Sequence, residues 1–137
     1  MRRASRRVSQ LYDSALAPSG LRSTQFAMLA RIAGSDSPTM SELAAALVLD
    51  RSALAHNLKP LERDGLVKVV VDPDDRRSRI VTITSSGAAR LAEGARLWRR
   101  AQAAFEGAYG KRRAAELRKT MDLLADPAFS EAFAARL

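Results

Sequence analysis

The residues best suited to chemistry form a polar stripe along a predicted helix between positions 50 and 64. Its short polar and basic side chains recur at spacings of four, three and four residues, which places them on one helix face: Ser52, His56, Lys59 and Arg63. A helix that enters the major groove of DNA needs such a face, because donors and cations must meet base edges and phosphates. Taken alone, the stripe also fits the ordinary solvated face of an amphipathic helix.

Two arginines occupy the tip of a predicted β-hairpin directly after this helix. The runs 66–71 and 79–84 are rich in β-branched residues, and the turn 72–78 between them is charged. We expect Arg76 and Arg77 to be exposed, with Asp75 orienting a neighbouring arginine through a charge-assisted hydrogen bond. An arginine at such a tip can enter a narrow minor groove. The tip also fits a turn kept soluble by its charges, but the two features in succession favour DNA binding.

The elements that must position these residues are mainly helical. Residues 2 to about 17 form the first predicted helix, and a second begins at Ser23 as N-cap. The residues of the second helix expected to face inward are Phe26, Leu29, Ala30 and Ala33. A short third helix is expected to start at Ser41. Its inward residues are Leu43, Ala44 and Leu47.

The polar-striped helix is predicted to begin at an Asp50 cap and to end at Gly65. Its buried side is expected to consist of Leu54, Leu58 and Leu61. Pro60 lies within it and predicts a local bend, because proline removes a backbone donor. Together with the hairpin, these elements predict a winged helix-turn-helix.

The C-terminal half predicts helices that meet a second copy of the chain. Ser85 or Ser86 is expected to cap a long helix that reaches about Tyr109. That helix carries a heptad-like stripe made of Leu91, Ala95, Trp98, Gln102, Phe105 and Tyr109. A small domain cannot cover so long a stripe from within. After Gly110, one more helix and a short terminal one are expected to follow.

Composition narrows the classes of protein and of site. Lys and Arg total 23 against 15 Asp and Glu, a formal net charge of +8, which favours a polyanionic partner. The chain has no Cys, which excludes disulfides, thiolate catalysis and Cys-based zinc sites, and a single His argues against a transition-metal site. The sequence contains no catalytic or cofactor-binding motif, so we expect a protein that is not an enzyme and binds no cofactor. Without a membrane span or a signal-peptide core, a cytoplasmic protein is expected.

Several stretches resemble the MarR family of bacterial transcriptional regulators. They are 20–26, 39–44, 50–52 and 61–67, and the most specific is the run 72–77 followed by Ile83-Thr84-Ser85-Ser86-Gly87. The resemblance implies a homodimer whose first and last helices intertwine, and which binds a pseudo-palindromic operator with two recognition helices and two wings. Repression is the implied mode, with release by a small aromatic or anionic effector.

The resemblance also implies roles for individual residues. The base-facing part of the recognition helix corresponds to Ser52, Ala53, His56 and Asn57. Contact with the DNA backbone is assigned to Lys59 and Arg63. The minor-groove arginine of the wing corresponds to Arg77, and its supporting carboxylate corresponds to Asp75. The predicted DNA-binding set also includes Ser41, Arg51 and Arg76.

The whole chain, 1–137, is thus predicted to be one regulator: mainly α with a small β-hairpin, and with N- and C-terminal helices forming a dimerisation region. The DNA-binding region spans about 22–86, the connecting helix about 86–109, and the dimerisation helices about 1–17 and 105–137. The predicted dimerisation residues are Val8, Leu11, Phe105, Tyr109, Leu117, Met121, Leu124, Phe129 and Phe133. Effector candidates are Arg7, Tyr12 and Trp98, although for each of them alone a role in the core or the dimer interface is favoured. The alternative function is a protein-interaction module that does not bind DNA.

Overall fold

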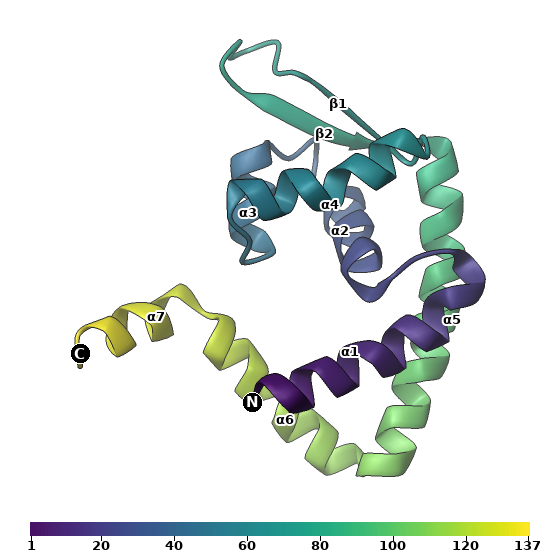
Figure 1. Cartoon of the computed structure of the whole chain (residues 1–137), viewed down its shortest axis with the longest axis vertical. Helices are drawn as coiled ribbons and strands as arrows, with labels where there is room; N and C mark the ends of the chain where they lie inside the picture. Colours follow the sequence, from purple (N-terminus) through teal and green to yellow (C-terminus); the bar gives the residue numbers. More distant parts are fainter. The chain divides into compact units, whose positions relative to one another are not determined.

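The computed structural model describes all residues, 1–137, and is mainly helical with one β-hairpin, as predicted (Figure 1). The elements are α1 (Arg2–Leu16), the 3-10 turn η1 (Ala17–Ser19), α2 (Ser23–Gly34), α3 (Met40–Ala46), α4 (Arg51–Arg63), β1 (Val67–Val71), β2 (Arg79–Ile83), α5 (Ser85–Tyr109), α6 (Lys111–Ala125) and α7 (Pro127–Ala134). The chain divides into two compact units, Met1–Arg99 and Arg100–Leu137, which are described in turn.

The N-terminal unit is built around a core in which the leucine face of α4 packs against α2, α3 and the hairpin. The fully buried side chains include Leu29, Leu43, Leu54, Leu61 and Val81. The predicted leucine face of α4 is therefore confirmed. Burying such a side chain stabilises the fold by about 1.5–3 kcal/mol, so this face fixes which side of α4 remains outside.

The inward face of α2 differs from the prediction. Phe26 and Leu29 are buried as expected, but Ala30 and Ala33 are exposed, and Met28 and Ile32 are buried in their place. The larger side chains occupy the core because they remove more apolar surface from water than alanine does.

The second helix begins at Ser23 as predicted, but the cap assigned to it and the start of the third helix differ from the prediction. Ser23 is the first residue of α2 rather than its cap, and its N–H and hydroxyl both donate to Asp13 Oδ1 at 2.7 Å. The third helix starts at Met40 rather than Ser41, because Thr39 and Glu42 form a reciprocal capping box: Thr39 Oγ1 accepts from Glu42 N at 3.1 Å, and Glu42 Oε2 accepts from Thr39 N at 2.8 Å.

The ends of α4 agree with the sequence. Asp50 Oδ1 accepts from Ala53 N at 2.7 Å, which confirms the predicted cap. Gly65 ends the helix with a φ of 72°, a left-handed conformation that glycine adopts without a steric penalty. Pro60 lies in the last turn, and α4 continues through it to Arg63, so the expected disturbance does not interrupt the helix.

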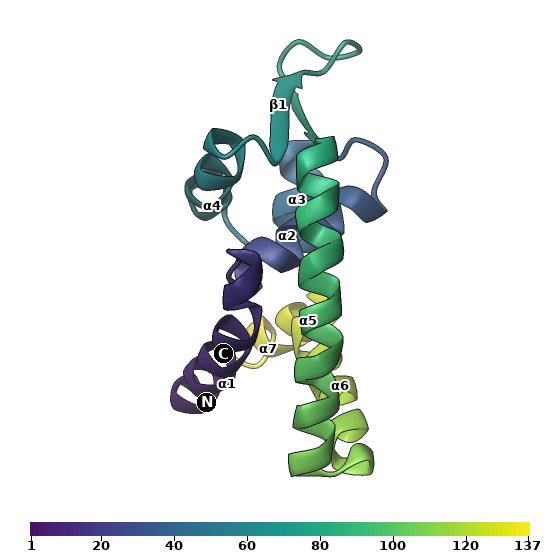
Figure 2. The same cartoon turned by 90° about the vertical axis from the view of Figure 1, so that its right-hand side faces the viewer.

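The hairpin pairs β1 and β2 antiparallel, with Val67 opposite Ile83 and Val71 opposite Arg79. It is also tied to the segment before α3: Thr39 forms an isolated bridge with Ile80, and Val81 N donates to Pro38 O at 2.9 Å. Figure 2 shows the hairpin standing beyond the start of α5, with α4 beside it. These bonds fix the wing relative to the helix-turn-helix.

The C-terminal unit contains the last part of α5 with α6 and α7. Arg118 Nη1 donates to Glu106 Oε1 at 2.8 Å, and this bond lowers the pKa of Glu106. Phe105 and Tyr109 pack with ring centroids 5.5 Å apart, and Asp126 caps α7 by accepting from Ala128 N at 2.8 Å. Across the whole chain, no helix combines the length and apolar character needed to cross a membrane.

Candidate nucleic-acid interface

The outer face of α4 carries the predicted polar stripe. Ser52, His56, Lys59 and Arg63 are all exposed, while the leucines on the opposite side are buried. Arg51 is exposed in the first turn of the same helix, and Ser41 is exposed in the first turn of α3. The structure therefore has the two-sided geometry that a groove-reading helix requires.

The two remaining α4 candidates are less open. Ala53 is half-buried, and its N–H is used by the Asp50 cap. Asn57 is half-buried, and its Nδ2 donates to Ala53 O at 2.8 Å. That bond holds the Asn57 amide group against its own helix, so one of its two N–H donors is already used in the free protein.

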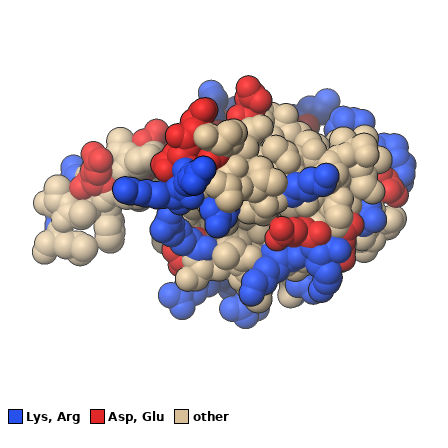
Figure 3. Space-filling view, turned by 90° about the horizontal axis from the view of Figure 1, so that it is seen from above, with Lys and Arg blue, Asp and Glu red and all other residues tan.

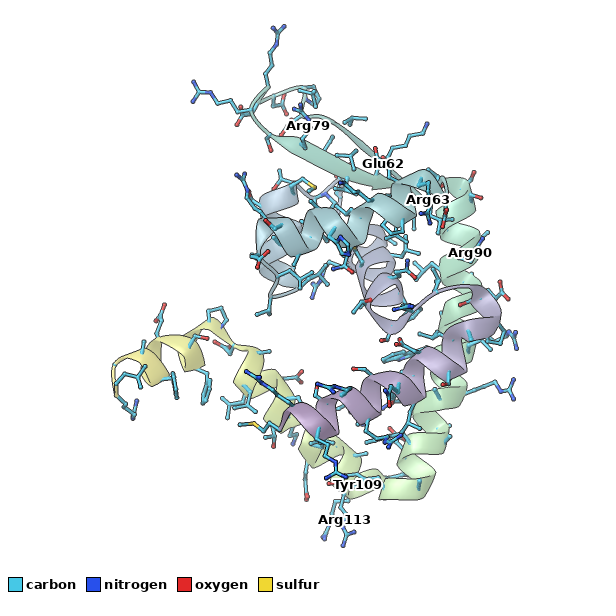
Figure 4. All side chains as sticks on the ribbon, viewed as in Figure 1. Glu62, Arg63, Arg79, Arg90, Tyr109 and Arg113 are labelled. Carbon is cyan, nitrogen blue, oxygen red and sulfur yellow. The ribbon has the colours of Figure 1, made fainter.

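A shallow hollow of about 560 Å³ lies along the second half of α4. It is lined by His56, Lys59, Pro60, Glu62 and Arg63. Figure 4 shows Glu62 and Arg63 at the end of α4 nearest α5. Sequence reasoning missed Glu62, although its spacing of three residues from Lys59 was a signal. Its carboxylate can accept a hydrogen bond from a cytosine amine, a contact that its neighbours Lys59 and Arg63 cannot make because they only donate.

Arg63 forms one ion pair at this end of the helix. Its Nε lies 3.1 Å from Asp64 Oδ1, and both side chains are largely exposed. Exposed pairs of this kind contribute about 0–1 kcal/mol, so a phosphate can displace Asp64 at low cost. Arg63 is therefore poised for backbone contact without being locked in place.

The hairpin tip is an ordered turn stabilised by its own aspartates. Asp72 N donates to Ser78 O at 3.1 Å, Asp72 Oδ1 accepts from Asp74 N at 2.9 Å, and Ser78 N donates to Asp75 O at 2.9 Å. Arg76 and Arg77 are exposed at this tip. The charges predicted at the wing are thus presented to solvent on a defined backbone.

Asp75 acts differently from the prediction. Its Oδ1 accepts from the backbone N–H of Arg77 at 3.0 Å, not from an arginine guanidinium. An Asp side chain commonly bonds the backbone two residues ahead in this way, because the ring it closes is short and unstrained. Asp75 therefore fixes the backbone position from which the Arg77 side chain extends. The Arg77 guanidinium stays free to reach a partner.

The hairpin carries further basic side chains that were not predicted from the sequence. Lys68 and Arg79 are exposed on β1 and β2, and Figure 4 shows Arg79 on the hairpin. Strand alternation was the available signal, because it places Lys68 on the side opposite the buried Val67. Seen from the hairpin side, Lys and Arg side chains are spread around this face with fewer Asp and Glu (Figure 3).

Apolar side chains on α1 and in the C-terminal unit are exposed in the single chain. Leu11 on α1 is 56% exposed, Met121 on α6 is 55% exposed and Phe133 on α7 is 57% exposed. The other predicted dimerisation residues that are exposed are Val8, Tyr109, Leu124 and Phe129, whereas Phe105 and Leu117 are half-buried. Sequence reasoning missed Leu123 and Leu137, which are also exposed. The expected apolar surfaces are present in each unit.

The three effector candidates do not form one site. Tyr12 is buried, with its ring centroid 4.5 Å from that of Trp98, and Trp98 stacks on Phe26 at 5.2 Å. Arg7 is exposed on α1 and stands five residues, or about 140° of helical rotation, from Tyr12. The structure therefore brings Tyr12 and Trp98 together as packed aromatics and leaves Arg7 apart.

Comparison with known proteins identifies related chains. A family model described as MarR family matches residues 19–78. The transcriptional activatory protein BadR of Rhodopseudomonas palustris is 39% identical over 71 residues, which cover 50% of this chain and 41% of BadR. The match thus spans about two fifths of that relative.

Similar solved structures cover almost the whole chain. The Mycobacterium tuberculosis transcriptional regulator MosR in complex with DNA is 40% identical, with a TM-score of 0.84 over 99% of this chain and 95% of that one. The transcriptional repressor CouR bound to a 23-mer DNA duplex is 28% identical, with a TM-score of 0.84 over 91% and 89%. CouR from Rhodococcus jostii RHA1 bound to p-coumaroyl-CoA is 24% identical, with a TM-score of 0.77 over 92% and 89%.

Proposed function

The chain belongs to the MarR family of transcriptional regulators, and from this we propose that it is a homodimeric repressor that binds a pseudo-palindromic operator. The family consists of transcriptional regulators rather than enzymes. The observation that carries the proposal is the joint presentation of two basic features, the outer face of α4 and the Arg76–Arg77 hairpin tip, on one compact unit. The bonds from Thr39 and Pro38 to β2 hold that arrangement.

Each feature has its own role in the proposed complex. Ser52 and His56 read base edges in the major groove, while Lys59 and Arg63 contact phosphates. Arg77, whose backbone N–H is bound by Asp75, inserts its side chain into the adjacent minor groove. Recognition needs both, since phosphate contacts set the register of the protein and only base contacts specify the sequence.

The proposed division of the chain follows from the same complex. DNA is bound by residues of about 22–86, and the dimer is formed by the helices of about 1–17 and 105–137. The helix of about 86–109 connects the DNA-binding region to the dimerisation region. The exposed apolar side chains of α1, α6 and α7 support a second copy as their partner, because water-exposed apolar surface of this kind is stabilised by burial. A two-fold axis then places the two α4 helices about 34 Å apart, one turn of DNA.

The proposal is tested by selecting bound duplexes from a random pool with the purified protein. The expected result is a two-fold symmetric site with half-sites one helical turn apart and a steep loss of affinity with salt. His56→Ala is expected to cost about 1–3 kcal/mol and to relax preference at one base position in each half-site. Lys59→Ala is expected to weaken binding to all duplexes alike and to lower the salt dependence. Arg96→Ala on α5 removes the same formal charge at an exposed position outside the proposed DNA-binding and dimerisation segments, and serves as its control, with little change expected.

Four outcomes would contradict all or part of the proposal. Recovery of no sequence would refute specific DNA binding, and an asymmetric site bound by a monomer would refute the dimer. If His56→Ala weakens binding equally for all operator variants, His56 does not read a base. Capture of a protein partner with no DNA binding would favour the interaction-module alternative.

Whether the protein represses or activates transcription needs a separate measurement. CouR is named a repressor and BadR an activatory protein, so relatives act in both directions. The operator is placed across a promoter that drives a reporter gene, and we expect expression to fall when the protein is supplied. A rise in expression would establish activation and overturn the repressor assignment while leaving the DNA-binding role intact.

An effector of the aromatic or anionic class is the last part of the proposal. The p-coumaroyl-CoA bound to CouR supports this class of ligand. Trp98 is the single Trp of the chain and packs between Tyr12 and Phe26, so a ligand that enters this aromatic row must change its fluorescence. Titration with aromatic acids and their CoA thioesters, read both by Trp98 emission and by DNA release, tests it. Release of DNA without any change in Trp98 emission would place the effector elsewhere.

A further inference from the structure

The run Thr84–Gly87 has no part in the proposed DNA contacts, yet it lies where the recognition helix, α4, meets the start of α5. Helix α4 ends in a Schellman motif: Gly65 N donates to Glu62 O at 3.0 Å, and Leu66 N donates to Leu61 O at 2.8 Å. Leu66 is therefore fixed to the last turn of α4. Any group that holds Leu66 also holds the recognition helix.

Thr84 bonds to this end of α4 and to the start of α5 at once. Its hydroxyl donates to Gly65 O at 2.6 Å and accepts from Gly87 N at 3.0 Å, and its backbone N–H donates to Leu66 O at 3.0 Å. Thr84 is thus the N-cap of α5, in place of the predicted Ser85 or Ser86. The cap is chosen by its partner 19 residues earlier in the chain.

Gly87 allows the two segments to touch. A Cβ at this position would lie 2.0 Å from Leu66 O and 2.9 Å from Leu66 C, whereas real Cβ contacts do not fall below 3.0 Å. The first turn of α5 therefore packs backbone to backbone against Leu66. Any larger residue must push α5 and the end of α4 apart by about 1 Å.

We propose that Thr84 and Gly87 are positioning residues for DNA recognition, acting through a joint formed by Gly65, Leu66, Thr84 and Gly87. The joint sets the angle of α4 relative to α5, the helix that leads on to the C-terminal unit. This inference rests on the proposed DNA-binding function. Base reading depends on that angle because hydrogen bonds to base edges tolerate little displacement, while attraction to phosphates is not tied to one geometry.

The first test compares two small enlargements on the same helix, α5. Gly87→Ala is expected to weaken binding to the selected operator roughly tenfold, about the loss of one base contact, while affinity for random duplex DNA stays within about twofold. Ala92→Ser is the matched control, since it also adds one heavy atom to α5, but at an exposed position outside the proposed DNA-binding and dimerisation segments. It is expected to leave both affinities unchanged.

The second test keeps the inference falsifiable if Gly87→Ala fails to fold. Thr84→Val has nearly the same shape but lacks the hydroxyl, and Thr84→Ser retains it. We expect Thr84→Val to lose discrimination between the operator and versions whose half-sites are one base pair closer or farther apart. Thr84→Ser is expected to restore that discrimination, which a role in stability alone would not require.

A measurement without DNA examines the joint directly. Amide hydrogen exchange at Leu66 and Gly87 is expected to be faster in Thr84→Val than in the wild type, with exchange in the α2 core unchanged. Unchanged exchange and unchanged discrimination would overturn the inference while leaving DNA binding established. The inference would also be overturned if the variant lost affinity for the operator and for random DNA by the same factor and was less thermally stable, because that result indicates a purely structural role. If the wild type itself does not discriminate, the proposed function fails and the positioning role fails with it.

Discussion

Val48 is expected to destabilise the turn between α3 and α4, and its replacement by glycine should stabilise the protein. Val48 has a φ of 54° and stands at the end of α3, where Val48 N donates to Ala45 O at 3.2 Å and Leu49 N donates to Ala44 O at 2.9 Å. This is the same Schellman motif that ends α4, where glycine occupies the corresponding position. A β-branched residue in the left-handed region is a conformational outlier.

The magnitude follows from three contributions. Relief of the left-handed conformation is worth about 1–2 kcal/mol. The greater backbone entropy of glycine in the unfolded chain opposes this by about 0.5–1 kcal/mol. Little burial is lost, because Val48 is 71% exposed. Val48→Gly should therefore raise the free energy of unfolding by about 0.5–1 kcal/mol, which corresponds to a rise of about 2–5 °C in Tm for a chain of this size.

The assay is thermal and urea unfolding at one protein concentration, because the stability of an oligomer depends on concentration. Gly65→Ala provides the opposite control, since its φ of 72° penalises alanine while nothing lies within 4 Å of its Cβ. It should lower stability by about 1 kcal/mol. A Val48→Gly protein that is less stable than the wild type would refute the reasoning, as it would mean that the valine side chain stabilises the turn.

Three further predictions concern acid stability, the core and the wing. The hydrogen bonds from the Ser23 hydroxyl and backbone lower the pKa of Asp13 from its usual 3.8, so their contribution is complete above that pH and is lost as pH falls through the lower folded value. The difference in unfolding free energy between wild type and Asp13→Asn should therefore shrink below pH 3.8, and a constant difference would contradict this. Leu54→Ala should cost about 2–5 kcal/mol by urea unfolding, because the side chain is fully buried; a cost near zero would show that the site is open. Arg77→Ala should reduce the slope of log affinity against log salt by about 0.9 per copy and weaken binding more than Arg76→Ala, since Asp75 fixes only the Arg77 backbone; equal effects would argue against that role for Asp75.

The sequence by itself determined the features that depend on neighbouring residues. Helical spacing placed Ser52, His56, Lys59 and Arg63 opposite a leucine face, because side chains three or four residues apart must share one side of a helix. The hairpin and the Asp50 cap were equally predictable, since turn chemistry and capping act over a few residues.

Tertiary structure decided which of several suitable residues form each contact. Thr84 caps α5 instead of Ser85 or Ser86 because only Thr84 also reaches the carbonyl of Gly65. The pairing of Tyr12 with Trp98 and the burial of Met28 and Ile32 depend on partners distant in the sequence. Such choices are set by packing between elements, where spacing along the chain does not specify which surfaces meet.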